Sequence, residues 1–423
     1  MWNALAGDWL PIRGRPRVRT EIGDRLLDCL HQDPARTELT RRANVTVDEW
    51  EAVFALARAH NVDALLAFRL RSRGVEDRLP DAVRKTALDA RRRGMHVGLR
   101  VRESLTRLTT ALQTAGVPVI VLKGAHLAHV VYPDPSLRWM SDVDLLVQFA
   151  DLERAAMLLR VGGCRQIAPS SVYVHHLPRF FQAFPPAVEL HWRLAPNDRA
   201  PENDLWQRAA PLRIAGVDTL GLCPEDLLLH LCVHGSYAHR FMLGLRPICD
   251  IAETVRHFGG TMVWADVLSR ARRYRCHRGV NLMLRLAKEM LGAAVPDDVL
   301  RALPSESLDD ALRTARFMTL EGNQIGLGMP AQVVSVSNAT TWPGRISVLW
   351  RSLFVPTKFL AATYGLSPRS PRVFLYYPVR LKDLLKRYGS VVLRLLRRDP
   401  TLTGIAREVA MIQHWLWDDT GND

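Results

Sequence analysis

The sequence predicts an α+β protein: a small α/β core with a mixed sheet, flanked by N-terminal helices and by a large helical C-terminal region. Three observations predict this class. Apolar residues recur every three to four positions up to about residue 115, which indicates helices. Short apolar runs then alternate with helical segments, as in an α/β unit. From Pro224 onward the helical period returns.

We divide the chain into four segments on the same pattern. Residues 1–90 form an N-terminal helical region, 91–215 an α/β domain, and 216–325 a helical domain that completes a cleft. Residues 326–423 form a basic helical region, entered through a stretch at 326–341 that we expect to be a loop because it has neither period nor strong charge. A chain of 423 residues, 48% of them hydrophobic, can bury such a core without disulfide bonds or structural metal ions.

The first helices have recognisable ends. One is expected at Val47–Arg58, where Thr46 can cap the first turn and acidic residues follow it. Another runs from about Arg91 to Ala115. It ends at Gly116, because glycine readily adopts the left-handed conformation that closes a helix.

The α/β core begins at the apolar run Val117–Leu122, which is rich in β-branched residues and suits a buried strand, with Pro118 tolerated near its start. In chain order, the next elements are a helix at Gly124–Tyr132, a strand at Asp142–Val147, a helix at Asp151–Gly163 that Asp151 can cap, and candidate strands at Cys164–Ala168, near Arg179–Phe184 and at Ala187–Leu194. On the last of these strands, Trp192 is expected to pack in the core.

Cysteine usage and apolar runs indicate a cytoplasmic protein. The six cysteines lie far apart, without a CxxC pair or the dense spacing of secreted disulfide frameworks. The N-terminus lacks the apolar region of a signal peptide, and the longest apolar stretch, Ile346–Leu366, is interrupted by Arg351, Pro356 and Lys358. We therefore expect neither secretion nor insertion into a membrane.

The chain is basic, with 57 Lys and Arg against 43 Asp and Glu and a net charge of +14. The excess lies in three clusters, at Arg13–Arg19, Arg84–Arg102 and Arg380–Arg398. Such charge attracts nucleotides, nucleic acid or anionic lipid, but a solvated helix face explains each cluster equally well. Leu381–Leu396 is a basic amphipathic pattern suited to peripheral contact with an anionic membrane, although an ordinary surface helix is the simpler interpretation.

Two carboxylates on one predicted strand are the first sign of a site. Asp142 and Asp144 are two positions apart, so both side chains point to one face with their Cα atoms roughly 6 to 7 Å apart. Glu189 and His191 share a face of a later strand in the same way. A third carboxylate on an adjacent strand completes an oxygen-rich site of the kind that Mg²⁺ prefers together with substrate phosphates. Such a site can hold two metal ions.

A phosphate-binding turn is predicted upstream of these carboxylates. Lys123 and Gly124 end one strand and begin a helix, where free backbone N–H groups and the helix dipole favour a phosphate. Lys123 adds a point charge, and Gly124 permits close approach of the backbone. Arg138 can hold a phosphate with two parallel hydrogen bonds, and Ser141 can bond nearby.

Together these residues resemble a known family. The stretches that carry the resemblance are Val121–Val147, Val188–Leu194, Pro224–Gly235 and Ile248–Glu253, and they are similar to the uncharacterised bacterial nucleotidyltransferases of the DNA polymerase β superfamily. The resemblance implies a nucleotidyltransferase fold, with Asp142 and Asp144 as metal ligands and Glu189 as the third carboxylate. The sequence departs from the superfamily at the phosphate turn, where Lys123-Gly124-Ala125 replaces the glycine-serine pair.

These observations predict an enzyme that transfers a nucleoside monophosphate from an NTP, with ATP as the expected donor, to a hydroxyl of a small molecule, sugar, peptide or protein. The expected catalytic and Mg²⁺-binding residues are Asp142, Asp144 and Glu189, and those expected to bind the nucleotide are Lys123, Gly124, Arg138, Ser141 and His191. Because the phosphate turn is altered, one alternative is a catalytically inactive or regulatory nucleotide-binding module that retains the fold. A nucleic-acid-binding protein ranks last, since no recognised nucleic-acid module is present.

Three other residues have competing interpretations. His230 and His234 have the spacing of zinc ligands on a helix, but no glutamate stands between them as in HExxH, and we favour core or site-lining histidines. Asp250 lies in an apolar helix and needs a partner. We expect an ion pair with Arg246 one turn earlier, with contact to the acceptor substrate as the alternative.

Overall fold

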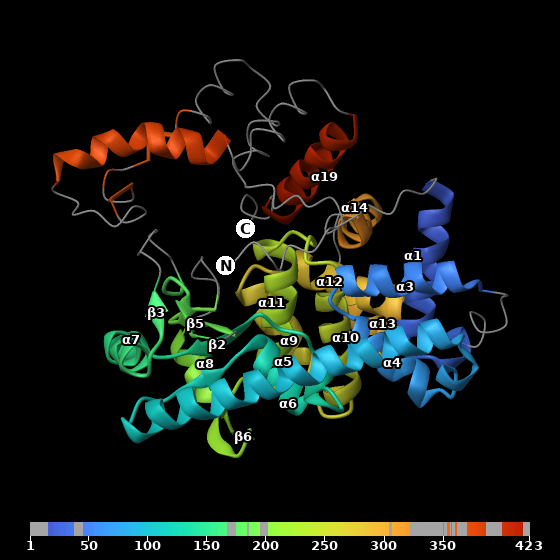
Figure 1. Cartoon of the computed structure of the whole chain (residues 1–423), viewed down its shortest axis with the longest axis horizontal. Helices are drawn as coiled ribbons and strands as arrows, with labels where there is room; N and C mark the ends of the chain where they lie inside the picture. Colours follow the sequence, from blue (N-terminus) through green and yellow to red (C-terminus); the bar gives the residue numbers. More distant parts are fainter. Residues whose placement is uncertain are drawn as a thin grey trace.

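The computed structural model describes residues 16–37, 45–166, 175–183, 186–194, 202–303, 307–321, 370–385 and 400–417, together with 350, 353–355, 357 and 360–361. N-terminal helices lie at one end of the described part and a sheet at the other, with a further set of helices between them (Figure 1). The predicted loop at 326–341 and the arginines at 13 and 15 lie outside the described residues, as do 386–396 of the predicted basic amphipathic segment. Residues 376–385 are helical.

The N-terminal helices are α1 (Pro16–Leu30), α3 (Val47–Ala59), α4 (Asp63–Ser72) and α5 (Asp81–Thr114). Thr46 caps α3 as predicted, because its side chain accepts from the backbone N–H of Glu49, whose carboxylate accepts in return from that of Thr46. Helix α5 starts ten residues earlier than expected, directly after Pro80, and runs alongside both the other N-terminal helices and the sheet (Figure 1). Gly116 closes it with a φ of +69°.

The described residues form a mixed sheet, as predicted, and its seven strands lie in the order β3-β4-β5-β2-β1-β7-β6. The strands are β1 (Ile120–Val121), β2 (Asp142–Leu146), β3 (Arg165–Gln166), β4 (Phe180–Phe181), β5 (Ala187–His191), β6 (Ala210–Ile214) and β7 (Val217–Gly221). Strand β2 is parallel to β5 and antiparallel to β1. The two central strands that carry the predicted carboxylates are therefore direct neighbours.

Some local predictions about the sheet were wrong. Strand β1 is shorter than predicted, because helix α6 (Lys123–Val130) begins two residues after Val121. The β6–β7 hairpin was missed. Its two-residue turn is formed by Ala215 and Gly216, whose φ values are +52° and +87°, as such a turn requires. Short helix α8 (Glu202–Arg208) was missed as well.

Two side chains differ from their expected roles. Helix α7 (Leu152–Val161) begins after a 3₁₀ turn, and Asp151 stands at its N-cap position without a side-chain hydrogen bond to the helix. Trp192 is half-buried rather than in the core, and its ring lies edge-on to Phe149 at 6.2 Å. Because β5 ends at His191, the strand alternation that predicted a buried Trp192 no longer applies.

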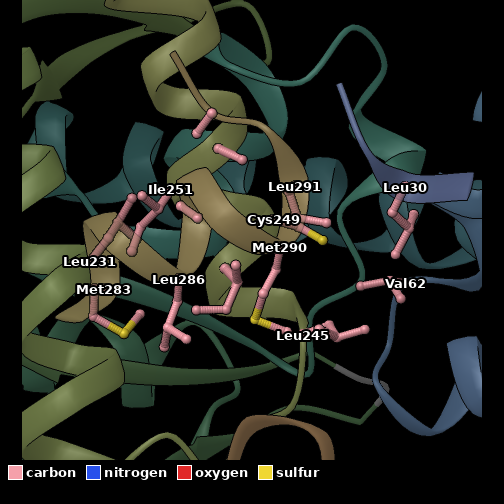
Figure 2. Close-up of a cluster of buried hydrophobic side chains, with 14 of the residues drawn as sticks. Leu30, Val62, Leu231, Leu245, Cys249, Ile251, Met283, Leu286, Met290 and Leu291 are labelled. Carbon is pink, nitrogen blue, oxygen red and sulfur yellow. The ribbon is translucent and has the colours of Figure 1, made fainter. Parts of the chain in front are cut away.

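Helices from the C-terminal half bury one side of the sheet and join it to the N-terminal helices. They are α9 (Pro224–Val233), α10 (Arg246–Phe258), α11 (Trp264–Arg273), α12 (His277–Leu291), α13 (Asp297–Arg301), α14 (Leu308–Glu321) and α19 (Pro400–Trp417). One continuous core includes residues of α1, α3, α4, α9 to α14 and α19. Figure 2 shows Leu30 and Val62 of the N-terminal region beside Leu245, Cys249, Met290 and Leu291.

A second core lies on the opposite face of the sheet. Alternate residues of the central strands, such as Val143, Leu145 and Val188, pack there against α5 and α7. The intervening positions of β2 and β5 are left for the other face, and these positions carry the predicted site residues. All six cysteines are free. Among the described helices, none has both the length and the apolarity needed to span a membrane.

Candidate active site

A cleft of about 970 Å³ lies between the sheet and the C-terminal helices. One wall comes from β2, β5, the start of α6 and the residues before β4, and it holds Lys123, Asp142, Asp144 and Glu189. The other wall comes from the end of α9, the segment between α9 and α10, and the end of α19. The two walls differ in charge, and their residues are described in turn below.

Strand pairing brings three carboxylates together. In the parallel register of β2 and β5, Asp144 lies opposite Glu189, so both side chains point to the same face of the sheet. Ligand atoms of Asp144, Glu189 and His191 lie within 4.8 Å of one another, and all three residues are buried. Asp142 lines the same cleft two positions before Asp144. Such a group of oxygen and imidazole donors fits a divalent cation.

Lys123 reaches this cluster from the turn between β1 and α6. Its Nζ lies 2.8 Å from Oδ1 of Asp144. Burial alone would lower the pKa of the Lys123 ammonium, but the neighbouring carboxylates raise it, so Lys123 is charged. Its φ of +43° is uncommon for a residue with a side chain and is typical of strained functional sites.

Gly124 lies at a tightly packed point of the same turn. A Cβ atom at this position would lie 3.3 Å from Cβ of Met140 and 3.4 Å from Nη1 of Arg138. Helix α6 therefore starts with its backbone close to the cleft, as the sequence predicted for a phosphate-binding turn. Ser141 also lines the cleft, at its exposed rim, and its carbonyl oxygen accepts a hydrogen bond from Ala187 N–H at 3.0 Å.

Arg179 was missed by the sequence reasoning and lies directly over the carboxylates. Its Nη2 is 3.0 Å from Oδ2 of Asp142, and its Nε donates to Glu189. The side chain is half-exposed and bridges the two carboxylates from the solvent side. Its position one residue before β4, which pairs with β5, was the available signal, but the sequence does not reveal which strands are neighbours.

The three carboxylates differ in pKa, because they repel one another and lie at different positions relative to Lys123 and Arg179. Burial raises the pKa of Asp142, and repulsion by Asp144 and Glu189 adds to that rise. Burial also disfavours ionised Asp144, but the charge of Lys123 and the hydrogen bond with His191 hold the pKa of that carboxyl well below its usual range. The pKa of Glu189 is lowered to about 2, because His191, Lys123 and Arg179 outweigh its burial. The cluster thus concentrates negative charge in a shielded place.

His191 is the nitrogen donor of the cluster. Its Nε2 lies 2.9 Å from Oδ1 of Asp144 and 3.5 Å from Oε2 of Glu189. The bridge that His176 forms with His191 places a second imidazole beside it, with ring centroids 5.0 Å apart. Neither His175 nor His176, which both line the cleft, was singled out from the sequence.

Arg138 lines the cleft but is committed to a structural partner. Its Nε and Nη2 donate to the two oxygens of Asp250 at 2.6 and 2.7 Å, and Tyr132 Oη donates to the same carboxylate at 2.8 Å. The expected ion pair between Asp250 and Arg246 is therefore wrong. The helical spacing of these two residues allowed that pair, but Arg138 reaches Asp250 from the sheet side and uses both of its oxygens.

The opposite wall contains an unusual backbone. Helix α9 passes into a π-helix, His234–Ala238, and Arg240 and Phe241 then have φ values of +50° and +62°. His234 lines the cleft, whereas His230 is buried behind it. Within the described residues, the zinc interpretation finds no support, because neither histidine belongs to a group of three metal-ligand residues. Cleft residues that sequence reasoning missed on this wall include Tyr237, His239, Arg240 and Trp417.

Three carboxylates on two adjacent parallel strands of a mixed sheet, with a lysine at a strand–helix turn beside them, form an arrangement that can hold a divalent cation next to phosphate oxygens. The chain belongs to a nucleotidyltransferase family described as "Uncharacterised nucleotidyltransferase", whose model matches residues 46–292, more than half of its length. Searches of curated proteins and of solved structures found no match to the chain.

Proposed function

We propose that the protein transfers a nucleoside monophosphate from an NTP, with ATP as the donor, to a hydroxyl group of an acceptor that is a small molecule, sugar, peptide or protein. The observation that carries this proposal is the convergence of Asp142, Asp144 and Glu189 beside Lys123. Membership of a nucleotidyltransferase family supports the reaction class. The proposed metal is Mg²⁺, held by the three carboxylates with His191 beside them.

Each residue of the carboxylate wall has a proposed role. When bound, Mg²⁺ supplies charge neutralisation for the triphosphate and the leaving pyrophosphate. Lys123 and the backbone at Gly124 hold phosphate oxygens, with Ser141 bonding at the rim. One of the carboxylates accepts the proton of the acceptor hydroxyl. Arg138 acts by packing against Gly124 and joining the sheet to α10, because its guanidinium faces Asp250 rather than open space.

The proposed setting is the cytoplasm, which the six free cysteines favour. Peripheral contact with an anionic membrane is supported by exposed apolar side chains beside basic ones near the C-terminus. The exposed apolar residues are Phe374, Leu375, Leu381 and Leu385, and the basic residues in the same segment are Arg372, Arg380 and Lys382. This contact is independent of the chemistry in the cleft.

A catalytically inactive or regulatory nucleotide-binding module is the second candidate, and one observation favours it. Lys123 and Arg179 already form ion pairs with all three carboxylates, so the chain itself offsets most of the negative charge that a metal ion would meet. Titration calorimetry with ATP, with and without Mg²⁺, separates the candidates. An enzyme shows binding that depends on the metal, whereas a metal-independent or absent signal favours the inactive module.

The decisive test of the enzyme is nucleotide transfer by variants of the carboxylates. Wild type, Asp142→Asn and Asp144→Asn are incubated with labelled NTPs, Mg²⁺ and host lysate, and acceptors are sought by mass spectrometry as nucleotide-sized mass gains. We expect each variant to fold and to lose at least about a thousandfold in transfer, or roughly 4 kcal/mol of transition-state stabilisation. Asp218→Asn on the exposed β6–β7 hairpin is the matched control. Full transfer by both variants would refute the assignment.

A further inference from the structure

The wall that faces the carboxylates carries positive charge without acidic partners. Lys123 and Arg179 form ion pairs with the three carboxylates, and Arg138 is neutralised by Asp250. Arg240 and Arg246 also line the cleft, and within the described part of the chain neither forms an ion pair with an Asp or Glu. Among the described residues, Arg240 and Arg246 are therefore the two cations of the cleft without an ion-pair partner.

Arg246 is the more constrained of the two. Both oxygens of Asp250, its nearest candidate partner along α10, are used by Arg138. Nε of Arg246 is shielded from solvent and has no hydrogen-bond partner among the residues that the structure describes. Burial lowers the pKa of this guanidinium to about 10, and the neighbouring Arg138 adds to the decrease, while the attraction of Asp250 and Asp142 offsets only part of it. A buried, unpaired charge costs stability, so its presence in a cleft indicates a bound partner of opposite charge.

The backbone that carries this wall is strained and tightly packed. The π-helix His234–Ala238 and the left-handed residues Arg240 and Phe241 lie directly before α10. Such geometry is frequent at functional sites. A Cβ atom added to Gly279 of α12 would lie 2.4 Å from both Ser236 Oγ and Tyr237 Cε2, so α12 fixes the π-helix closely. The position of the wall is therefore built into the packing.

Hydrogen-bonding groups surround the two arginines. Gln413 on α19 contacts Arg240. With the Gln413 side-chain oxygen turned toward the guanidinium, it accepts from Nε of Arg240 at 2.6 Å and orients that group. His234 and His239 lie beside them with ring centroids 4.4 Å apart. Burial lowers the pKa of His239 to about 4, so it is neutral near pH 7 and can donate or accept a hydrogen bond.

We infer that Arg246, with Arg240, forms an oxyanion-binding subsite across the cleft from the carboxylates, specific for a phosphate or carboxylate group. The inference rests on the proposed function for its role, because the anion is carried either by the triphosphate tail of the donor nucleotide or by an acidic acceptor. Both sources present the same chemistry, two oxygens that a guanidinium can bind through parallel N–H groups. The subsite is distinct from the turn at Lys123 and Gly124.

Titration calorimetry with inorganic phosphate tests the subsite without metal or turnover. The titrations are done at low ionic strength with EDTA present. We expect Arg246→Met to weaken phosphate binding about tenfold or more. The matched control, Arg213→Met on the exposed hairpin, should bind phosphate as wild type does. Arg246→Lys, which keeps the charge but loses the planar fork, should bind with intermediate affinity. Equal phosphate affinity in wild type and Arg246→Met would overturn the inference.

Thermal melting supplies an independent readout. Because Arg246 forms no ion pair with any described Asp or Glu, Arg246→Met should melt at or above the temperature of wild type. A clearly lower melting temperature would show that Arg246 has a structural partner and would also overturn the inference.

Competition between ATP and bound phosphate identifies the source of the anion. Displacement of phosphate by metal-free ATP assigns the subsite to the nucleotide, and simultaneous binding assigns it to the acceptor; both outcomes support an oxyanion subsite. Failure of the proposed function has a different signature. In that case wild type shows no Mg²⁺-dependent ATP binding, whatever its affinity for phosphate.

Discussion

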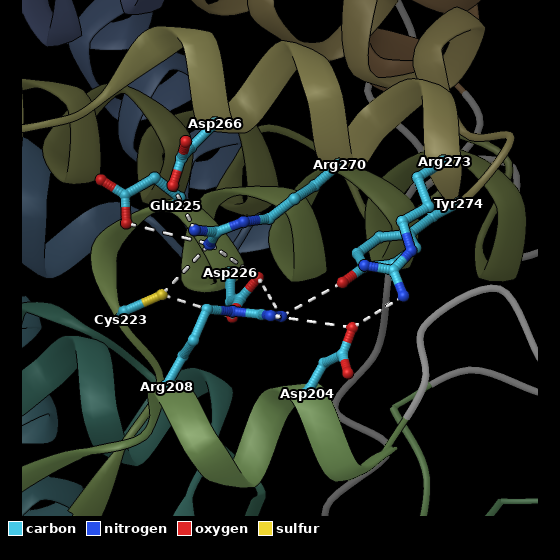
Figure 3. A network of polar contacts seen from close by, with 9 residues as sticks. All are labelled: Asp204, Arg208, Cys223, Glu225, Asp226, Asp266, Arg270, Arg273 and Tyr274. Atoms are coloured by element: carbon cyan, nitrogen blue, oxygen red, sulfur yellow. Dashed lines mark hydrogen bonds and ion pairs between the residues drawn. The ribbon is translucent and has the colours of Figure 1, made fainter.

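Two clusters of buried charge, in different parts of the molecule, are organised in opposite ways. The first joins α8, α9 and α11, and Figure 3 shows it as a closed network around Asp226. Asp226 accepts from Arg208 Nε at 2.8 Å and from Arg270 Nη1 at 3.1 Å. Further contacts include Arg208 with Tyr274 Oη, Arg270 with Asp266 and Cys223, and Arg273 with Asp204. Acidic and basic groups alternate throughout.

The cleft separates its charges instead. Carboxylates gather on the sheet wall, and Arg240 and Arg246 stand on the helical wall without acidic partners in the described residues. Both clusters have buried carboxylates, Asp226 in one and Asp144 and Glu189 in the other, and both contain several arginines, so burial and charge alone do not distinguish function from structure. The distinction lies in whether the groups are satisfied by one another, since an unsatisfied charge is costly and is retained where a ligand completes it.

The largest effect is expected from opening the closed network. Asp226→Ala removes the shared acceptor of Arg208 and Arg270 and leaves two guanidinium groups facing each other. We expect the free energy of unfolding to fall by about 3–5 kcal/mol, the usual cost of breaking a buried ion pair on one side. Chemical denaturation followed by circular dichroism measures it.

The control for this experiment lies in the exposed ion pair between Asp218 and Arg213. Asp218→Ala should change stability by no more than about 1 kcal/mol, because exposed pairs contribute little. The folded fraction of Asp226→Ala should keep the nucleotide binding of wild type. A stable Asp226→Ala protein with lost nucleotide binding would reverse the comparison, since the network would then be the functional cluster.

The carboxylate wall could be predicted from the sequence because local rules determine it. Alternation along a strand fixed the common face of Asp142 and Asp144, and a second alternating run placed Glu189 and His191 together. The strand–helix turn at Lys123 followed from residue type and spacing. The register that joins these strands is not local, but both strands had only one polar face to offer.

The helical wall could not be predicted, because its geometry depends on tertiary packing. Nothing local marks His234–Ala238 as a π-helix, and the left-handed Arg240 and Phe241 contradict residue preference. The wrong pairing of Asp250 had the same origin. A helix rule favoured Arg246, whereas Arg138, 112 positions away in the chain, supplied better geometry. Contacts of that separation leave no signal in a single sequence.

An intermediate effect is expected from acid, through a histidine behind the cleft. Burial, with the nearby charge of Lys123, lowers the pKa of His230 to about 3 from the ordinary value of 6.5. Between about pH 3 and pH 6.5, His230 therefore binds a proton in the unfolded chain but not in the folded chain. Stability is unaffected above about pH 6.5 and falls below it, by roughly 1.4 kcal/mol per pH unit, or about 2.7 kcal/mol at about pH 4.5.

Replacing His230 isolates this contribution from those of other titrating groups. In His230→Leu, the difference in unfolding free energy from wild type should stay constant between about pH 7 and pH 9 and should shift in favour of the variant as the pH falls below about 6.5. Denaturant titrations across this range measure the difference. A difference that is independent of pH would mean that His230 is accessible to protons in the folded state, and that the wall is less closed than its burial indicates.

The smallest effect is expected from replacing Arg179, which shares features with both clusters. Arg179 pairs with Asp142 and Glu189 as a network arginine would, yet its side chain is half-exposed and its ion pairs are therefore weak. If a divalent cation takes the same oxygens, it must displace this guanidinium. Arg179→Gln should then bind Mn²⁺ about tenfold more tightly, or by roughly 1.4 kcal/mol, as measured by electron paramagnetic resonance of free Mn²⁺.

Arg213→Gln is the control of equal charge change and should bind Mn²⁺ as wild type does. Weaker Mn²⁺ binding by Arg179→Gln would show instead that Arg179 holds the carboxylates in place for the metal, as the closed network holds Asp226.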